Sequence, residues 1–143
     1  MATPPPHFDR FGFDEAWQVG TALVGRARHD QLPVTIGIWL GEQRVFHAAL
    51  PGTSADNDAW IHKKARVVHH FRRSSLEVFE HYDIANNPHF FETFGLSSAE
   101  YAPGEGAVPI LVNGVLAGVL SISGLEQGGD HDLAVWGLQT LQS

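Results

Sequence analysis

The stretch VPILVNGVLAGVLSIS, residues 108–123, decides the fold. Two runs rich in β-branched and aliphatic residues flank Asn113-Gly114, a dipeptide that favours a tight turn between antiparallel strands. It therefore predicts a β-hairpin. The second strand is apolar or small on both faces, so we expect either helices on both sides of the sheet or a sheet face used in oligomerisation.

The remaining elements follow from apolar periodicity and turn signals. Alternating residues on either side of Gly41-Glu42 predict a second hairpin, whereas three- and four-residue spacings predict helices. Because hairpins supply no crossovers, the sequence predicts an α/β fold with an antiparallel sheet covered by helices. Residues 83–103 are irregular, and we expect the phenylalanines there to cover an edge of the core. The expected elements are a helix over 13–29, a hairpin over 34–50, a helix from about 53 to 71 with a short continuation to 82, and a helix from Asp130 to the C-terminus.

Composition and charge exclude several classes of function. The 143 residues predict one domain over 13–143, preceded by a flexible arm over 1–12 that holds three prolines. A net charge of −7 disfavours binding to nucleic acid or to an anionic membrane. Cysteine is absent, which excludes disulfide and thiolate chemistry. The N-terminus does not resemble a secretory signal, so we expect a cytoplasmic location.

The helix over 53–71 contains an anomaly. At 100° per residue, Asn57 and Lys64 fall on the same side as Trp60, where the apolar face is expected. A buried ammonium requires an anion or carbonyl groups to replace its hydration. Lys64 either extends to the surface or pairs with a structural carboxylate such as Glu105 or Asp130, or it lines a pocket for an anionic or carbonyl-bearing ligand.

Nine histidines raise the question of a metal site. His62 and His69 are two helical turns apart rather than one, so we interpret them as solvent-facing and expect no metal site. His47 falls within a strand and is expected to be flanked by core. Asp130 is interpreted as an N-cap, with His131 in the first turn of the last helix.

Two blocks of sequence resemble the GlcG/HbpS-like haem-degrading domain family. The first is PGTSADNDAWIHKK, residues 51–64, with KAR from Lys64 to Arg66, and the second is VPILVNGVLAGVLSISGLEQGGDHDLAVWGL, residues 108–138. The resemblance covers roughly residues 13–141. It implies an α-β-α sandwich with a profilin-like antiparallel sheet of four to five strands, assembly into homo-oligomers, and haem as the candidate cofactor. One departure is that Glu105, Gly106 and Ala107 replace a glycine triplet of the family.

Three functions are compatible with these residues. The first is a small-molecule-binding protein, for haem or another anionic ligand, with His47 or His131 as the candidate haem ligand. The second is an enzyme acting on a small carbonyl compound or acid through Lys64 or His131. The third is a homo-oligomeric interaction module without catalysis. The predicted ligand-binding residues are Asn57, Trp60, Lys64, Glu105, Gly106, Ser123 and His131.

Overall fold

A computed structural model describes residues 3–126 and 128–142. The predicted helices, including the short continuation that ends near residue 82, and both predicted hairpins are present, whereas β1, η1, α4 and η2 were not predicted. In chain order the elements are β1 (His7–Phe8), α1 (Phe13–His29), β2 (Thr35–Leu40), β3 (Gln43–Ala49), α2 (Ala55–Phe71), α3 (Ser75–His81), η1 (Ile84–Asn86), α4 (Phe90–Phe94), β4 (Ala107–Val112), β5 (Val115–Ser123), α5 (Gly129–Gln139) and η2 (Thr140–Gln142).

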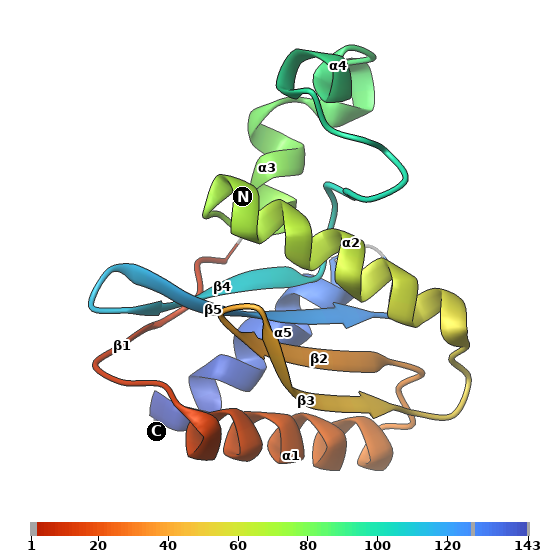
Figure 1. Ribbon diagram of the computed structural model, residues 1–143. Coiled ribbons are helices and arrows are strands. Elements are labelled where there is room, and N and C mark those ends of the chain that lie inside the picture. Colours follow the sequence, from red (N-terminus) through yellow and green to blue (C-terminus); the bar gives the residue numbers. More distant parts are fainter. Residues whose placement is uncertain (1–2, 127, 143) are drawn as a thin grey trace.

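The fold has three layers (Figure 1). The strands form one five-stranded sheet in the order β1-β4-β5-β2-β3. Helices α1 and α5 pack with Ile36 and Ile38 on one face, whereas Ile61 and Val68 of α2 pack with Trp39 on the other. The prediction of an α/β fold with helices on both faces of a sheet is confirmed.

The hairpin at Asn113-Gly114 forms as its dipeptide predicts. Both residues have positive φ, 51° and 79° respectively, as a two-residue turn of this type requires. The turn pairs Val112 with Val115 and holds β4 and β5 antiparallel at the centre of the sheet. This register places Ser121 and Ser123 on the face of the sheet that α2 covers, where the Ser123 hydroxyl contacts Asn57.

The N-terminal edge differs from the prediction in two respects. The sheet is mixed, because β1 pairs parallel to β4, with His7 opposite Leu111 and Phe8 opposite Val112. The segment predicted as a flexible arm therefore supplies a strand, and Phe11 is buried in the core. A strand of two residues is too short to show a period-2 pattern, and its partner lies about a hundred residues away.

The aromatic residues between α2 and β4 form a separate cluster. We expected this segment to cover an edge of the main core. Instead, α3 and α4 project beyond one end of α2 (Figure 1), and rings from this segment pack with Phe71 at the end of that helix. The rings that surround Phe90 are Phe71, Tyr82, Phe91 and Phe94.

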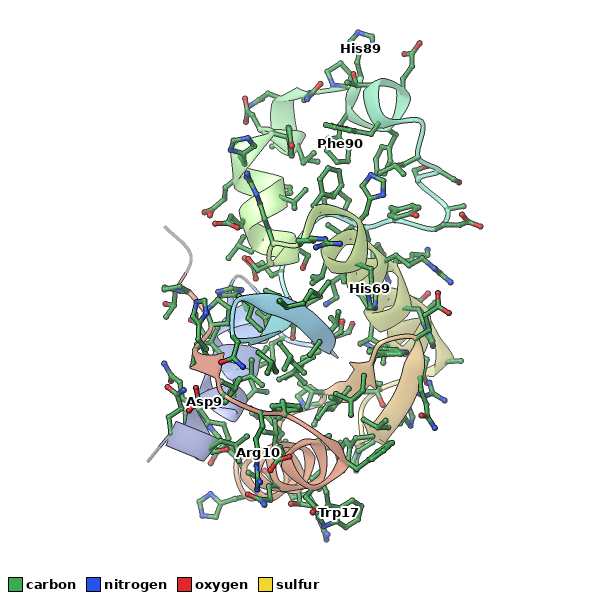
Figure 2. The ribbon with its side chains drawn as sticks, turned by 60° about the vertical axis from the view of Figure 1, so that its left-hand side comes forward. Asp9, Arg10, Trp17, His69, His89 and Phe90 are labelled. Carbon is green, nitrogen blue, oxygen red and sulfur yellow. The ribbon has the colours of Figure 1, made fainter. Side chains whose placement is uncertain are left out.

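The outer side of α1 exposes two large apolar side chains. Phe13 and Trp17 are both about two-thirds exposed, at 65% and 64%, and Trp17 points away from the sheet (Figure 2).

Of the helices in the described part of the chain, none has the length and apolar character needed to cross a bilayer.

Candidate functional site

The start of α2 is tied both to its own cap and to the sheet. The Ser54 hydroxyl accepts the Asp56 N–H, and the Ser54 N–H donates to the Asn57 Oδ1 atom at 3.0 Å. The other side-chain group of Asn57, its Nδ2, donates to the Ser123 hydroxyl of β5 at 3.1 Å. Asn57 therefore fixes the entry of α2 onto the sheet.

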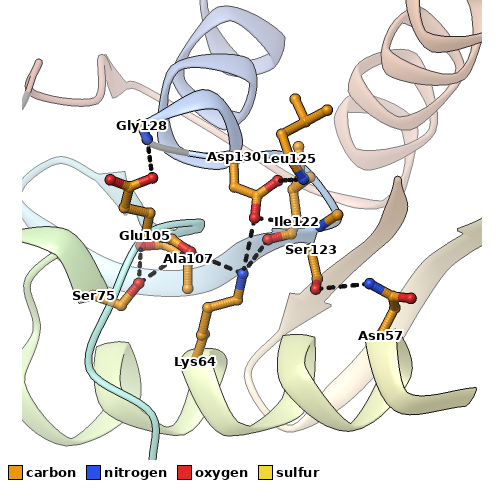
Figure 3. Close-up of polar contacts among 11 residues, drawn as sticks. Asn57, Lys64, Ser75, Glu105, Ala107, Ile122, Ser123, Leu125, Gly128 and Asp130 are labelled. Carbon is orange, nitrogen blue, oxygen red and sulfur yellow. Dashed lines mark hydrogen bonds and ion pairs between the residues drawn. The ribbon is translucent and has the colours of Figure 1, made fainter. Parts of the chain in front are cut away.

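Lys64 lies on the buried side of α2, as the helical periodicity predicts, and is only 5% exposed. Its Nζ donates to the Glu105 carbonyl at 2.8 Å and to the Ile122 carbonyl, and it lies 3.5 Å from the Asp130 carboxylate (Figure 3). An ammonium has three N–H donors, and these three partners account for all of them. The predicted pairing of Lys64 with Asp130 is therefore present, together with two backbone carbonyls.

Asp130 is the anion of this pair, but it is not the N-cap of α5. That position is taken by Gly128, whose φ of 85° suits glycine. The Asp130 carboxylate instead accepts the Leu125 N–H at 2.8 Å and the Gly124 N–H at 3.3 Å. Burial lowers the pKa of the Lys64 amine and raises the pKa of Asp130, each against the attraction of its partner.

Glu105 and Gly106 have different roles beside Lys64. The Glu105 carboxylate accepts the Gly128 N–H at the start of α5, so only the backbone carbonyl of Glu105 contacts Lys64. The expected side-chain pair between Glu105 and Lys64 does not form. Gly106 has a φ of 130°, and a Cβ there would collide with the Ile122 carbonyl and the Lys64 Nζ. Glycine at this position allows the ammonium to reach the sheet.

An open cleft of about 370 Å³ lies beside this pair, and we call it the Lys64 cleft. Trp60 forms one wall at 43% exposure, and its Nε1 donates to the Asp56 carboxylate at 3.1 Å. Of the predicted ligand-binding residues, Gly106 lies under the Lys64 amine without lining the cleft. The predicted residues that do line it are Asn57, Trp60, Lys64, Glu105 and Ser123.

Two predicted histidines lie elsewhere. His131 is 1% exposed and contacts the Thr3 carbonyl through its Nε2 at 2.8 Å, so it does not line the Lys64 cleft. His47 is exposed rather than flanked by core, and its Nε2 lies 2.5 Å from the Asp58 carboxylate at the start of α2. His47 is exposed because β3 is the edge strand of the sheet and α2 does not cover the outer side of this strand.

A second open cleft, of about 460 Å³, lies between α2 and the end of the first hairpin. We call it the histidine cleft. It is lined by Trp39, Glu42, His62, Ala65, Arg66, His69, His70 and Tyr101. Partial burial lowers the pKa of both His62 and His69, so both imidazoles favour the neutral form near pH 7.

The sequence holds only part of the signal for the histidine cleft. The seven-residue interval between His62 and His69 puts them on nearly the same side of the helix, about 10 Å apart along its axis. Trp39 and Tyr101 reach the cleft only through the fold. Over residues 3–126 and 128–142, no group of three His, Asp or Glu residues is arranged to hold a metal ion.

Comparisons with known proteins identify the family of this chain. A family model described as haem degrading protein HbpS-like matches residues 11–139. The chain belongs to this HbpS-like family. A UPF0303 protein of Streptomyces coelicolor is 42% identical over 133 residues, which cover 92% of this chain and 84% of that protein. The resemblance inferred from the two sequence blocks is confirmed.

Solved structures support the same fold for the HbpS-like chain. The crystal structure of Ybr137w protein matches with a TM-score of 0.84 and 29% identity, covering 94% of this chain and 80% of that one. The crystal structure of the PduOC:Heme complex matches with a TM-score of 0.75 and 21% identity, covering 90% and 92% respectively. At this lower identity the likeness is one of fold.

Proposed function

We propose that this protein binds haem in the histidine cleft. The observation that carries the proposal is that one cleft combines imidazoles, aromatic side chains and a guanidinium group. The family description names haem, and a solved relative of the same fold is a haem complex. Both make haem the first ligand to test against the residues of this chain.

The Lys64 cleft does not fit a coordinated haem. Protein ligands to haem iron are His, Cys, Met or Tyr, and none of these lines that cleft. Its charged lining groups are mainly the carboxylates of Asp56, Glu105 and Asp130, which would repel haem propionates. The ammonium of Lys64 has no donor left for a propionate, because Glu105, Ile122 and Asp130 already use all three.

The histidine cleft supplies what a haem site needs. Neutral imidazoles are iron ligands, and the lowered pKa values of His62 and His69 favour that form. Tyr101 offers apolar ring surface to a macrocycle, whereas Trp39 is only 6% exposed and forms the buried base of the cleft. Arg66 donates one N–H to the Glu100 carbonyl at 3.1 Å and keeps further donors for a propionate.

The distribution of charge favours an anionic ligand at α2. Of the nine Lys and Arg residues, six lie between Arg44 and Arg73, although the whole chain carries −7. Only two of the sixteen acidic residues lie in the same segment. This local positive potential would attract the propionates of haem toward the helix. Bound haem would supply the iron chemistry, while the chain holds, orients and partly shields the group.

Titration with haemin tests this proposal. We expect the wild-type chain to give a saturable Soret shift. Arg66→Glu should weaken the affinity for haemin about tenfold, which corresponds to about 1.4 kcal/mol. Arg28→Glu, the same charge reversal on exposed α1, is the matched control and should titrate like the wild type. Absence of saturable binding would overturn the proposal, and equal effects of the two variants would place haem outside the histidine cleft.

A second candidate is a small carbonyl substrate in the Lys64 cleft. Lys64 lines this cleft, and burial lowers the pKa of its amine, which favours the neutral, nucleophilic form. Exposure to a panel of carbonyl compounds with borohydride, followed by mass measurement, should then label the peptide that contains Lys64. An unlabelled peptide would remove this candidate.

A further inference from the structure

Three histidines of α2 line the proposed haem site, and they differ in what already holds their rings. His62, His69 and His70 all line the histidine cleft. One imidazole nitrogen with a free lone pair suffices to bind haem iron on one side. The contacts of each ring therefore indicate which of them is available.

His62 is already engaged on both its nitrogen and its ring. The Arg44 Nη1 lies 3.4 Å from the His62 Nε2, and a guanidinium can only donate. The Nε2 lone pair of His62 is therefore directed at Arg44. Its ring also packs edge-on against Trp39, with centroids 5.2 Å apart. Binding iron through Nε2 would require both contacts to break.

His70 is held by aromatic rings. Its centroid lies 4.7 Å from that of Phe71 and 6.0 Å from that of Tyr101, both at steep angles. Phe71 belongs in turn to the aromatic cluster around Phe90. Turning the His70 ring into the cleft would remove these packing contacts.

His69 is the histidine without such constraints. It makes no hydrogen bond, ion pair or ring contact with any residue in the described ranges 3–126 and 128–142, and both its nitrogens are available. Figure 2 shows it on α2, apart from the cluster that contains Phe90. Glu42 lines the same cleft and acts on the charge of His69. A carboxylate is the usual acceptor for the second N–H of a metal-bound imidazole.

We propose that His69 is the residue of this chain that coordinates haem iron, with Arg66 as the partner of a propionate. The inference rests on the proposed haem binding and adds the ligand to it. Arg66 is three residues before His69 and therefore lies one helical turn away, in reach of the edge of a macrocycle whose iron is at His69. His62, which packs against Trp39, and His70, which packs against Tyr101, then form the sides of the site.

Spectroscopy of haemin-loaded full-length variants tests the assignment. His69→Ala should weaken haemin binding at least about tenfold, since even outer partners of metal ligands contribute that much. It should also change the Soret maximum and the electron paramagnetic resonance signal, and added imidazole should restore both. His29→Ala, which removes an exposed histidine of α1 outside the histidine cleft, is the control and should keep the wild-type spectra.

Each outcome decides between the two proposals. If the wild-type chain does not bind haemin, haem binding itself is wrong. If the wild type binds but His69→Ala keeps its affinity and spectra, or if His29→Ala loses them to the same extent as His69→Ala, the assignment of His69 is wrong. The exposed position of His69 means that His69→Ala should keep the wild-type urea midpoint, and His69→Gln provides a second variant of similar size.

Discussion

Replacing Lys64 by methionine should destabilise the protein severely, although no ligand is involved. The side chains of Lys64 and Asp130 are only 7% and 9% exposed. Lys64→Met leaves the Asp130 carboxylate buried without its cation, and it removes the donor to the Ile122 carbonyl. Breaking a buried ion pair from one side costs about 3–5 kcal/mol. We expect about 3 kcal/mol, because two backbone N–H groups still bind Asp130.

Urea unfolding followed by circular dichroism measures this loss. Lys63→Met is the matched control: Lys63 lies 5.0 Å above the Trp60 ring, a contact worth at most about 1 kcal/mol. Adding Asp130→Asn to Lys64→Met removes the stranded charge and should recover about 1–2 kcal/mol. A free energy of unfolding for Lys64→Met within about 1 kcal/mol of the wild type would refute the reasoning.

Three further predictions concern stability. Gly106→Ala should cost more than about 1–3 kcal/mol in thermal or urea unfolding, because φ is 130° and the new Cβ meets backbone; a wild-type midpoint would contradict this. Glu15 accepts the Gly12 N–H at 2.8 Å, which lowers the pKa of its carboxyl group. Its contribution to stability is therefore present above about pH 4.3 and lost as the pH falls through the lower pKa of the folded state. The difference in unfolding free energy between wild type and Glu15→Gln should shrink in that range, and a difference that stays constant would contradict this. Ser74 caps α3 by accepting the Glu77 N–H at 3.1 Å, so Ser74→Ala should cost about 1 kcal/mol, with Ser98→Ala as an exposed control.

Local signals were sufficient for most of the fold. Asn113-Gly114 predicts its hairpin because only a few residue types accept positive φ at both positions. The position of Lys64 is predicted equally well, since the helical period alone places it on the buried side of α2. In both cases the determining residues lie within a few positions of one another.

The partners in the site could not be predicted in the same way. Two of the three groups that receive Lys64 are backbone carbonyls, which no side-chain pattern reveals. Asp130 was among the candidate partners, but its role as N-cap was wrong because Gly128 takes that position. The histidine cleft needs Trp39 and Tyr101, which are brought to α2 by the sheet and by a long loop.

Paramagnetic broadening by haemin tests the central claim most directly, because ferric iron broadens amide signals near it in the ¹⁵N-labelled protein. We predict that the amides of residues 62–70 and of Tyr101 broaden first, whereas zinc protoporphyrin, which is diamagnetic, shifts the same signals without broadening them. Broadening centred instead on Gly104, Gly124 and Leu125, which line the Lys64 cleft, would contradict the account.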